Sequence, residues 1–440
     1  MRFATLVSAG LALSAVEAKP ISLKKVTAGF IDVIKKETTN WNKYIQSHLP
    51  HLTTKPKTYH RNNKWPKGVQ NGNYLDWKTF KANGVNLGNW LLIEYSSNQE
   101  WWDSIVPSSD VPKDEWSFCE SLGARCGPIL EAHYATYYTF ADIDKLASVG
   151  VNLLRVPLTY QAFINVPGSQ LHHGNQLTFF KLVTDYAIQR YGMHIVIDLH
   201  SLPGGCNGLD NGEALGHYNW WFNATNMEYS LQLVDKAMHY IQGSGHPNAY
   251  TLSIINEAIN NFTGIGTANT VTTDGVQYML GYLNKTLDIV QKINPKVPIM
   301  WQDSWMGESF WSPLFPQNAN IVVDVHIYFF SNLFSDAYSK YFTYSVCGAG
   351  DYFAGDKKFP VFVGEWSNEI LYNNSLADRK TNFDTQRYAY SQWASGSAFW
   401  SGKQYGNENV SGEGIRSDYW CYECMLDEGV ITAATTESYC

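Results

Sequence analysis

Short apolar runs recur along the chain from about residue 70 onward, separated by longer amphipathic or loop segments. Strands that alternate with helices indicate βα units and a parallel sheet. Eight units of this kind predict an α/β fold, a single (β/α)8 TIM barrel with long loops at its C-terminal face. The expected strands are 84–90, 151–157, 194–200, 250–257, 297–303, 321–328, 360–366 and 396–402.

One large domain is sufficient for this chain. Its 440 residues are 45% hydrophobic, which supports an extensive core. Helices are expected between the strands, for example at Phe140–Val149 and Leu177–Tyr191. Each is followed by a glycine, Gly150 or Gly192, which suits the left-handed position after a helix.

The first 70 residues differ from the rest. Arg2 precedes an apolar stretch over residues 4–16, with a small residue at position 18, which predicts a secretory signal peptide at 1–18. Residues 19–69 carry eleven Lys or Arg residues against two Asp or Glu residues. We interpret residues 19–70 as a basic linker or propeptide and residues 71–440 as the barrel domain.

Charge and hydropathy limit the partners of the chain. The whole chain has a net charge of −8 and residues 19–69 contribute +9, which leaves −17 for residues 70–440. An acidic body without a recognisable binding motif argues against nucleic acid. No later stretch reaches about 18 uninterrupted apolar residues, so no membrane span is expected. We predict a secreted, extracellular monomer, either free or associated with the cell wall.

Seven cysteines are present. In an oxidising compartment most should pair, and an odd one is left over. Cys421 and Cys424 have a spacing that also occurs in zinc and redox sites. No second such pair accompanies them, so a disulfide is the better interpretation, and the other pairings stay open.

Polar side chains stand near the C-terminal ends of the apolar runs. In a closed barrel those ends meet at one face, where barrel enzymes carry their chemistry. A single polar residue there is usually structural, but a whole set predicts a site. The set is Arg155, His200, Asn256, Glu257, Asp303, His326, Tyr328, Glu365 and Trp400.

Two glutamates in this set determine the expected chemistry. A carboxylate at the end of a buried strand is costly unless neighbouring groups hold it. Strands four and seven lie nearly opposite across a barrel mouth, so Glu257 and Glu365 can approach each other across a substrate. Retaining glycoside hydrolysis needs two carboxyl groups about 5–5.5 Å apart. We therefore predict a retaining O-glycoside hydrolase, with Glu257 as acid/base and Glu365 as nucleophile.

The neighbours of the pair would set its protonation. Arg155 and Tyr328 are suited to keep Glu365 ionised through charge and hydrogen bonding. Glu257 would be the partner with the raised pKa, protonated because of desolvation and the nearby negative charge.

The other polar residues are expected to bind the sugar. The Asn256 amide could hold the 2-hydroxyl, His200 and His326 would orient hydroxyls or carboxylates, and Trp400 would floor the pocket. Aromatic residues make up 15% of the chain. The pairs Trp101–Trp102 and Trp220–Trp221 are candidates either for sugar platforms or for packing beneath loops.

Other chemistries lack support in the sequence. The glycine-rich segment 204–208 has neither a Walker lysine nor the full dinucleotide fingerprint. His172 and His173 have no further ligand at matching spacing. No G-x-S-x-G nucleophile elbow occurs. We expect no cofactor and no metal.

The motifs together resemble glycoside hydrolase family 5. Those that carry the resemblance are Gly84–Trp90, Asp198–His200, Asn256–Glu257, His326–Tyr328, Gly364–Trp366 and Phe399–Ser401. Three further segments are similar to the secreted fungal exo-β-1,3-glucanase branch of that family: 114–123, 133–163 and 203–211. The resemblance covers roughly residues 75–405.

This resemblance implies a retaining enzyme in which Glu94 contacts the terminal glucose. The expected reaction is release of terminal β-1,3-linked glucose from β-glucan or a related β-glucoside. Asn89, Ala258 and the tail around Tyr419–Cys424 depart from the glucanase pattern. The alternative is therefore the related rutinosidase branch, which releases a disaccharide from flavonoid glycosides. An alternative of another class, a non-catalytic carbohydrate-binding barrel, would be favoured if either glutamate were replaced.

Overall fold

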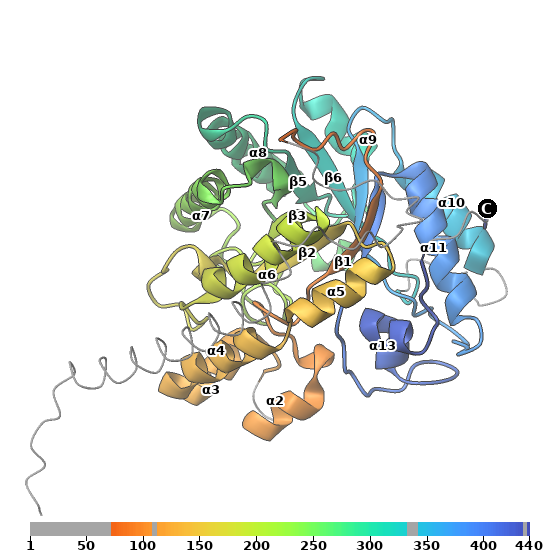
Figure 1. Ribbon diagram of the computed structural model, residues 1–440. Helices are drawn as coiled ribbons and strands as arrows, with labels where there is room; N and C mark the ends of the chain where they lie inside the picture. Colours follow the sequence, from red (N-terminus) through yellow and green to blue (C-terminus); the bar gives the residue numbers. More distant parts are fainter. Residues whose placement is uncertain (1–71, 108–111, 332–341, 434–437) are drawn as a thin grey trace, which may run out of the picture. The chain divides into compact units, whose positions relative to one another are not determined.

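Eight parallel strands form a closed barrel in the computed structural model, which describes residues 72–107, 112–331, 342–433 and 438–440 (Figure 1). Strands pair in chain order, and β8 returns to pair with β1. The predicted (β/α)8 barrel is confirmed. The strands are β1 (Ala82–Asn86), β2 (Leu153–Leu158), β3 (His194–Leu199), β4 (Tyr250–Ser253), β5 (Ile299–Gln302), β6 (Ile321–His326), β7 (Val361–Glu365) and β8 (Gly396–Phe399).

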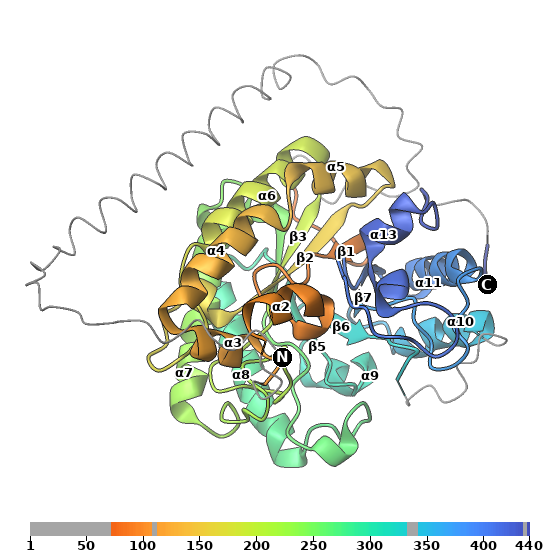
Figure 2. The ribbon, with the colours of Figure 1, turned by 90° about the horizontal axis from the view of Figure 1, so that it is seen from below.

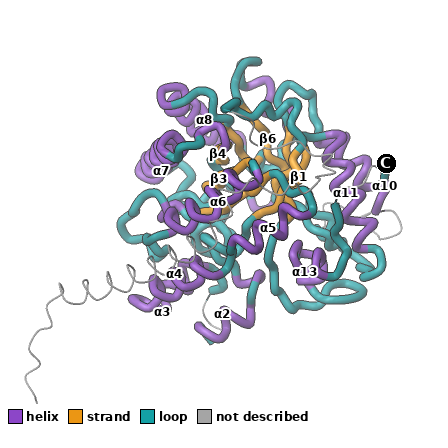
Figure 3. Tube along the Cα trace, viewed as in Figure 1, coloured by secondary structure: helices purple, strands orange, loops and turns teal. Residues whose placement is uncertain are grey.

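Helices surround the strands (Figure 3). Among the described residues, four α-helices lie between β1 and β2 in the chain, and two short ones follow β8. The helices are α2 (Gln99–Ile105), α3 (Glu115–Leu122), α4 (Cys126–Thr136), α5 (Phe140–Ser148), α6 (Gln176–Tyr191), α7 (Ala224–Gly243), α8 (Thr273–Ile293), α9 (Glu308–Trp311), α10 (Phe342–Phe353), α11 (Arg379–Trp393), α12 (Arg416–Trp420) and α13 (Tyr422–Asp427).

The two helices predicted by range are present as α5 and α6. At the start of helix α5, Asp142 Oδ2 accepts from the backbone N–H of Thr139 at 2.6 Å and from its hydroxyl at 2.9 Å. Gly150 and Gly192 follow the helices with φ values of 88° and 65°, as expected for glycines in the left-handed region. Local signals were therefore sufficient to place these helices.

Several strands are shorter than the sequence predicts. The runs 250–257, 321–328 and 396–402 leave the strand at Ser253, His326 and Phe399. Single backbone hydrogen bonds still continue past these points, from Ile254 N to the Met300 carbonyl, from Ile327 N to the Glu365 carbonyl and from Trp400 N to the Trp366 carbonyl. Strand β2 instead extends further than predicted, because its pairing with β3 continues to Leu158 rather than ending at Pro157.

Apolar side chains close the N-terminal end of the barrel. Trp77 and Phe80 precede β1 and pack against inward-facing residues of the strands, including Val196 and Phe362. Trp77 also donates from Nε1 to Thr251 Oγ1 at 2.9 Å. The polar site is therefore confined to the opposite end.

Gly364 in β7 makes room for a buried carboxylate. A Cβ atom on this glycine would lie 2.0 Å from Asp324 Oδ1. Asp324 belongs to β6, is fully buried and faces the same interior layer as Arg155. The glycine is therefore required by close approach.

Disulfides join Cys119 to Cys126, Cys347 to Cys440 and Cys421 to Cys424, and Cys206 is free and buried. The predicted disulfide at the C-x-x-C motif is confirmed. Within the described residues, no helix is long and apolar enough to cross a membrane. The predicted signal peptide (1–18) and basic segment (19–70) lie outside the described residues.

We predict that Gly364→Ala destabilises the fold, because the added methyl group must displace a buried carboxylate. Overpacking of this kind costs about 1–3 kcal/mol. The matched control is Gly281→Ala in α8, where a Cβ would meet nothing within 4 Å. It should stabilise by about 0.5–1 kcal/mol. Urea unfolding of both variants checks the pair, and equal midpoints would contradict the packing argument.

Candidate active site

The predicted site residues come together at the C-terminal end of the barrel, the end at which α2 lies in front of the strands in Figure 2. Hydrogen bonds, ion pairs and one ring contact join eight of them in a single network. Those eight are Arg155, His200, Asn256, Glu257, His326, Tyr328, Glu365 and Trp400. Glu94 lies close enough to both catalytic candidates to interact with their charges.

Glu365 is the last residue of β7 and is buried. Arg155 Nη1 donates to its Oε1 at 2.7 Å, and the Tyr328 hydroxyl donates to its Oε2 at 2.9 Å. Each carboxylate oxygen thus faces one of the two partners predicted from the sequence. This fixed position, with its lone pairs directed by two donors, suits a nucleophile.

Arg155 lies inside the barrel, one layer below the mouth. We placed it at the end of a strand, but β2 continues three residues further. Its guanidinium is completely buried and lies 3.1 Å from Asp198 Oδ2 and 3.6 Å from Asp324 Oδ2, besides its contact with Glu365. Burial would lower the pKa of Arg155, but these carboxylates raise it, so the group stays charged.

Glu257 faces Glu365 across the mouth. It follows β4 with a φ of 47°, a left-handed conformation that is uncommon for a residue other than glycine. One carboxylate oxygen of each glutamate and a ring nitrogen of His326 lie within 4.8 Å of one another. Carboxyl groups this close match the spacing of retaining glycosidases.

The pKa expected for Glu257 is wrong for the site without substrate. Burial raises the pKa of Glu257, as predicted, and is the largest single effect. The hydrogen bond with His326 Nδ1, at 2.8 Å, and the charges of His326 and His200 together lower the pKa below its usual value. His326 shows the reverse: burial lowers its pKa, but Glu365, Asp324 and Glu257 raise it well above the usual value. The proton of this pair therefore resides on His326.

Asn256 and His200 belong to a chain of hydrogen bonds beside the glutamates. Asn256 Oδ1 accepts from Arg155 Nη2, and its Nδ2 donates to His200 Nε2 at 3.1 Å. His200 Nδ1 in turn donates to Asp198 Oδ2 at 2.6 Å. The His200 ring stacks on Trp400 with centroids 5.7 Å apart. One N–H of the Asn256 amide is left to meet a sugar hydroxyl.

Glu94 lies in the loop after β1, at the start of the 3₁₀ helix Tyr95–Ser97. Burial, together with Asp210, Glu365 and Glu257, raises its pKa well above the usual value. A protonated carboxyl group can donate a hydrogen bond as well as accept one, which suits a hydroxyl-rich ligand.

Three residues of the network were missed as site residues. Asn86, at the end of β1, accepts from Arg155 Nη1 at 3.0 Å, while Asp198 and Asp324 pair with the same guanidinium. All three lie within apolar runs that the sequence predicts as strands. Alternate side chains of a strand point to the same face, so counting alternate positions could have identified these polar residues as facing the barrel interior.

Other candidates serve the structure. Asp303 accepts from the backbone N–H groups of Trp305 and Gly307 and so shapes the loop after β5. Burial raises its pKa to about 6. The rings of Trp220, Trp221 and Trp102 are buried, and the indole N–H groups of Trp220 and Trp221 already donate hydrogen bonds within the protein. These rings are therefore not sugar platforms. Trp101 is only half-buried.

The spacing of Glu257, His326 and Glu365 would also suit a metal ion. However, His326 Nδ1 lies 2.8 Å from Glu257 Oε1, so two of the three candidate ligands are already paired with each other by a hydrogen bond. Acid/base chemistry accounts for the arrangement, and the expectation of no metal stays a prediction.

Comparison with known proteins identifies the family. Residues 125–406 match the cellulase family, described as cellulase (glycosyl hydrolase family 5). The chain belongs to this family. It is therefore a member of an enzyme family of glycoside hydrolases, as the motifs predict, and its buried glutamate pair argues against the non-catalytic alternative.

Individual relatives fall into two groups. Glucan 1,3-beta-glucosidase 1 of Schizosaccharomyces pombe is 31% identical over 308 residues, which is 68% of this chain and 72% of that protein. The crystal structure of rutinosidase from Aspergillus niger is 44% identical with a TM-score of 0.79, over 82% of this chain and 100% of that one. The crystal structure of AoRut is 45% identical with a TM-score of 0.79, over 81% and 98%.

The C-terminal tail supplies a residue that the sequence did not predict for the site. Trp420, at the end of α12, stacks on Tyr328 with centroids 5.3 Å apart and an interplanar angle of 19°. Its Nε1 donates to Glu369 Oε2, and the disulfide between Cys421 and Cys424 follows directly. The tail thus holds the ring whose hydroxyl donates to Glu365.

We predict that Trp420→Leu lowers kcat about tenfold, because Tyr328 loses its stacking partner and its hydrogen bond to Glu365 weakens. A tenfold decrease corresponds to about 1.4 kcal/mol, which is in the range for a hydrogen bond to a charged group. Trp420→Phe, which keeps a ring, should lose less. In a Tyr328→Phe background, Trp420→Leu should add little, because both changes act on one contact. Trp393→Leu on α11, where the ring is 39% exposed, is the control. Fully additive losses would contradict this coupling.

Proposed function

We propose that the protein is a secreted, retaining β-glycosidase of the rutinosidase type, which releases a disaccharide from flavonoid glycosides. The observation that carries this proposal is the 44–45% identity to the rutinosidase structure and to AoRut over nearly their whole length. The glucan 1,3-beta-glucosidases reach about 30% over two thirds of the chain. Similarity that includes the loops matters here, because loops at the barrel mouth shape the substrate pocket.

In the proposed mechanism, Glu365 attacks the anomeric carbon of the glucose next to the aglycone. The carbon–oxygen bond to the flavonoid breaks as a covalent glycosyl–enzyme forms. Arg155 and Tyr328 keep the attacking carboxylate in place, and Asn256 contributes an N–H to the 2-hydroxyl. Trp400 supports the sugar ring from below.

The leaving oxygen takes a proton from Glu257. That proton rests on His326 in the free site, 2.8 Å from Glu257 Oε1. Substrate binding expels water and disfavours two buried charges, so the proton moves across this bond to give a neutral acid and a neutral imidazole. In the second step Glu257 takes a proton from water as the water oxygen attacks the anomeric carbon. The bond between that carbon and Glu365 breaks, which releases Glu365 as a carboxylate and restores the β configuration.

Release of terminal glucose from β-1,3-glucan is the second candidate function. It was our leading expectation from the sequence, and the relatives named glucan 1,3-beta-glucosidase favour it. Both functions use the same glutamate pair and differ in what surrounds the glucose.

Three disulfides among the described residues are consistent with an oxidising compartment and so support the proposed secretion. The extracellular location rests on this observation together with the predicted signal peptide.

Incubation with rutin and with laminarin, analysed by chromatography, separates the two candidates. We predict rapid formation of quercetin and intact rutinose from rutin, and slow or no glucose release from laminarin. Glu365→Gln is the control for contaminating activity, because it cannot form the covalent intermediate. Glucose from laminarin as the main product, with rutin unchanged, would replace the proposal by the glucanase function.

We also predict a bell-shaped pH profile of kcat/KM. The alkaline limb reports loss of the proton shared by His326 and Glu257. Because the pKa of His326 is raised, the pair keeps this proton to a higher pH than Glu257 could alone. His326→Asn should therefore move the alkaline limb to lower pH. An unchanged limb would mean that the proton does not reside on His326.

A further inference from the structure

The C-terminal tail, formed by helices α12 and α13, contacts the active site at two places. Trp420, at the end of α12, stacks on Tyr328, whose hydroxyl donates to Glu365. The backbone of the same tail residue meets the segment after β8, because Ser401 N donates to the Trp420 carbonyl at 2.9 Å. Ser401 directly follows Trp400, the expected floor of the sugar pocket. The tail therefore supports both a donor to the nucleophile and the pocket floor.

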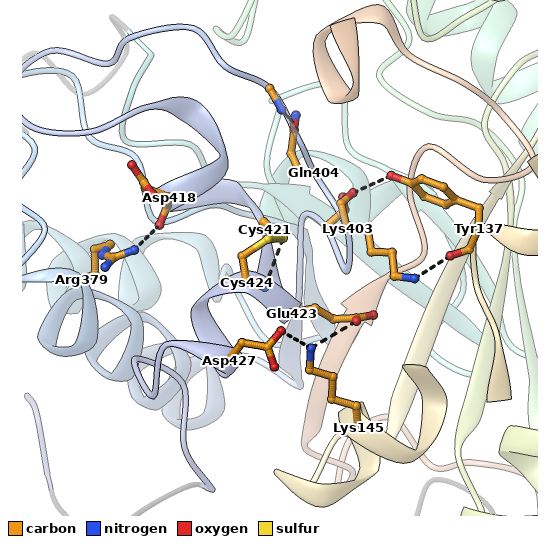
Figure 4. The surroundings of a disulfide bond; sticks show 12 residues. Tyr137, Lys145, Arg379, Lys403, Gln404, Asp418, Cys421, Glu423, Cys424 and Asp427 are labelled. Carbon is orange, nitrogen blue, oxygen red and sulfur yellow. Dashed lines mark hydrogen bonds and ion pairs between the residues drawn. A yellow bond between two sulfur atoms is a disulfide. The ribbon is translucent and has the colours of Figure 1, made fainter. Parts of the chain in front are cut away.

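Each helix of the tail is held by a charged side chain from another part of the chain (Figure 4). The helices have only five and six residues, too few to be stable alone. Arg379 of α11 donates from Nη1 to the Asp418 carbonyl of α12 at 3.1 Å. Lys145 of α5 pairs with Glu423 and Asp427 of α13 at 3.5 Å and 2.6 Å. The path of the chain between these anchors is set where the two helices join.

The junction of the two helices is Cys421, and a disulfide closes it. Cys421 N donates to the Ser417 carbonyl of α12 at 3.2 Å, while Cys421 Sγ accepts from Cys424 N of α13 at 3.2 Å. The disulfide joins Cys421 and Cys424, which are three residues apart. A disulfide stabilises the whole fold less when the loop that it closes is shorter. Its main effect here is therefore local, on the turn that directly follows Trp420.

This disulfide can be reached by a reductant from one side. Cys421 is buried, but Cys424 is only half-buried. Thiol–disulfide exchange needs access to one sulfur atom, since the other sulfur is the leaving group. By contrast, both cysteines of the Cys119–Cys126 pair are buried. The bond beside the active site is thus open to exchange.

We propose that the disulfide at this junction is a redox switch for catalysis, which holds Trp420 against Tyr328 when oxidised and frees it when reduced. A thiolate of a dithiol reductant attacks Cys424 Sγ, and the Cys421 sulfur leaves as a thiolate. The second thiol of the reductant then displaces Cys424 from the mixed disulfide. The dithiol gives up two electrons and becomes a cyclic disulfide, and its two protons end on the cysteines.

The consequence is that the protein becomes fully active only where this bond can form, in an oxidising compartment. The switch acts on the support of Glu365 through Tyr328. It therefore does not depend on which glycoside the protein hydrolyses.

The test measures kcat and KM before and after reduction with dithiothreitol, with 4-nitrophenyl β-rutinoside and 4-nitrophenyl β-glucoside as substrates. Reduction should lower kcat about tenfold, as for Trp420→Leu, with a smaller change in KM. Reoxidation should restore kcat. Alkylation of free thiols, followed by peptide mass spectrometry, shows which disulfides were open.

The double variant Cys421→Ser/Cys424→Ser should have the low kcat without reductant and no longer respond to it. Serine at position 421 still offers an oxygen that accepts from the first turn of α13, so the variant removes the bond and keeps the cap. In a Trp420→Leu background reduction should add little, because both changes act on one ring.

The matched control is Cys347→Ser/Cys440→Ser, which removes the disulfide between α10 and the last residue of the chain. This variant should keep both the wild-type kcat and the response to reductant. The proposal is overturned if kcat is unchanged when the Cys421–Cys424 bond is open, or if dithiothreitol does not open this bond in the folded protein. A fall in kcat that only follows the folded fraction, measured by circular dichroism, overturns it too. If the double serine variant does not fold, reduction of the wild-type protein decides.

Discussion

The buried guanidinium of Arg155 is the contact around which the site is organised. Moving such a charge out of water costs several kcal/mol, which must be offset by well-placed partners. Asp198, Glu365 and Asp324 surround it at 2.7–3.6 Å. Because the charge needs these partners, the barrel interior must hold three carboxylates at defined positions, and one of them is the proposed nucleophile.

Other features of the barrel follow from this requirement. Gly364 has no side chain because Asp324 occupies the space that a Cβ would need. Asn256 is oriented by Arg155 on one side and His200 on the other. His326 collects the proton of the site because it faces Glu257, Glu365 and Asp324 together. Catalytic geometry and fold stability thus depend on the same interior layer.

Much of the fold and the catalytic pair could be predicted from the sequence. The alternation of apolar runs with helices is set by local chemistry, so the barrel and the placement of α5 and α6 were predicted correctly. The roles of Glu257 and Glu365 stay predictions, but their approach across the mouth was expected from the opposition of strands four and seven. The pKa of Glu257 was not, because it depends on how closely His326 approaches, a distance that no motif encodes.

The loops were the least predictable part. Two contacts there join segments that are distant in the chain: Trp420 stacks on Tyr328, and the backbone N–H of Tyr405 donates to the Ser97 carbonyl. Sequence patterns describe one element at a time and do not show which loops meet. Substrate preference is decided in these loops, which is why the sequence favoured the glucanase branch while overall similarity favours the rutinosidases.

Trapping of the covalent intermediate tests the central claim most directly. An activated 2-deoxy-2-fluoroglucoside slows breakdown of the glycosyl–enzyme, and peptide mass spectrometry then locates the label. The account predicts one label per chain, on the peptide containing Glu365, and none in Glu365→Gln. Turnover of natural substrate without any trapped adduct, or a label on another residue, would contradict it.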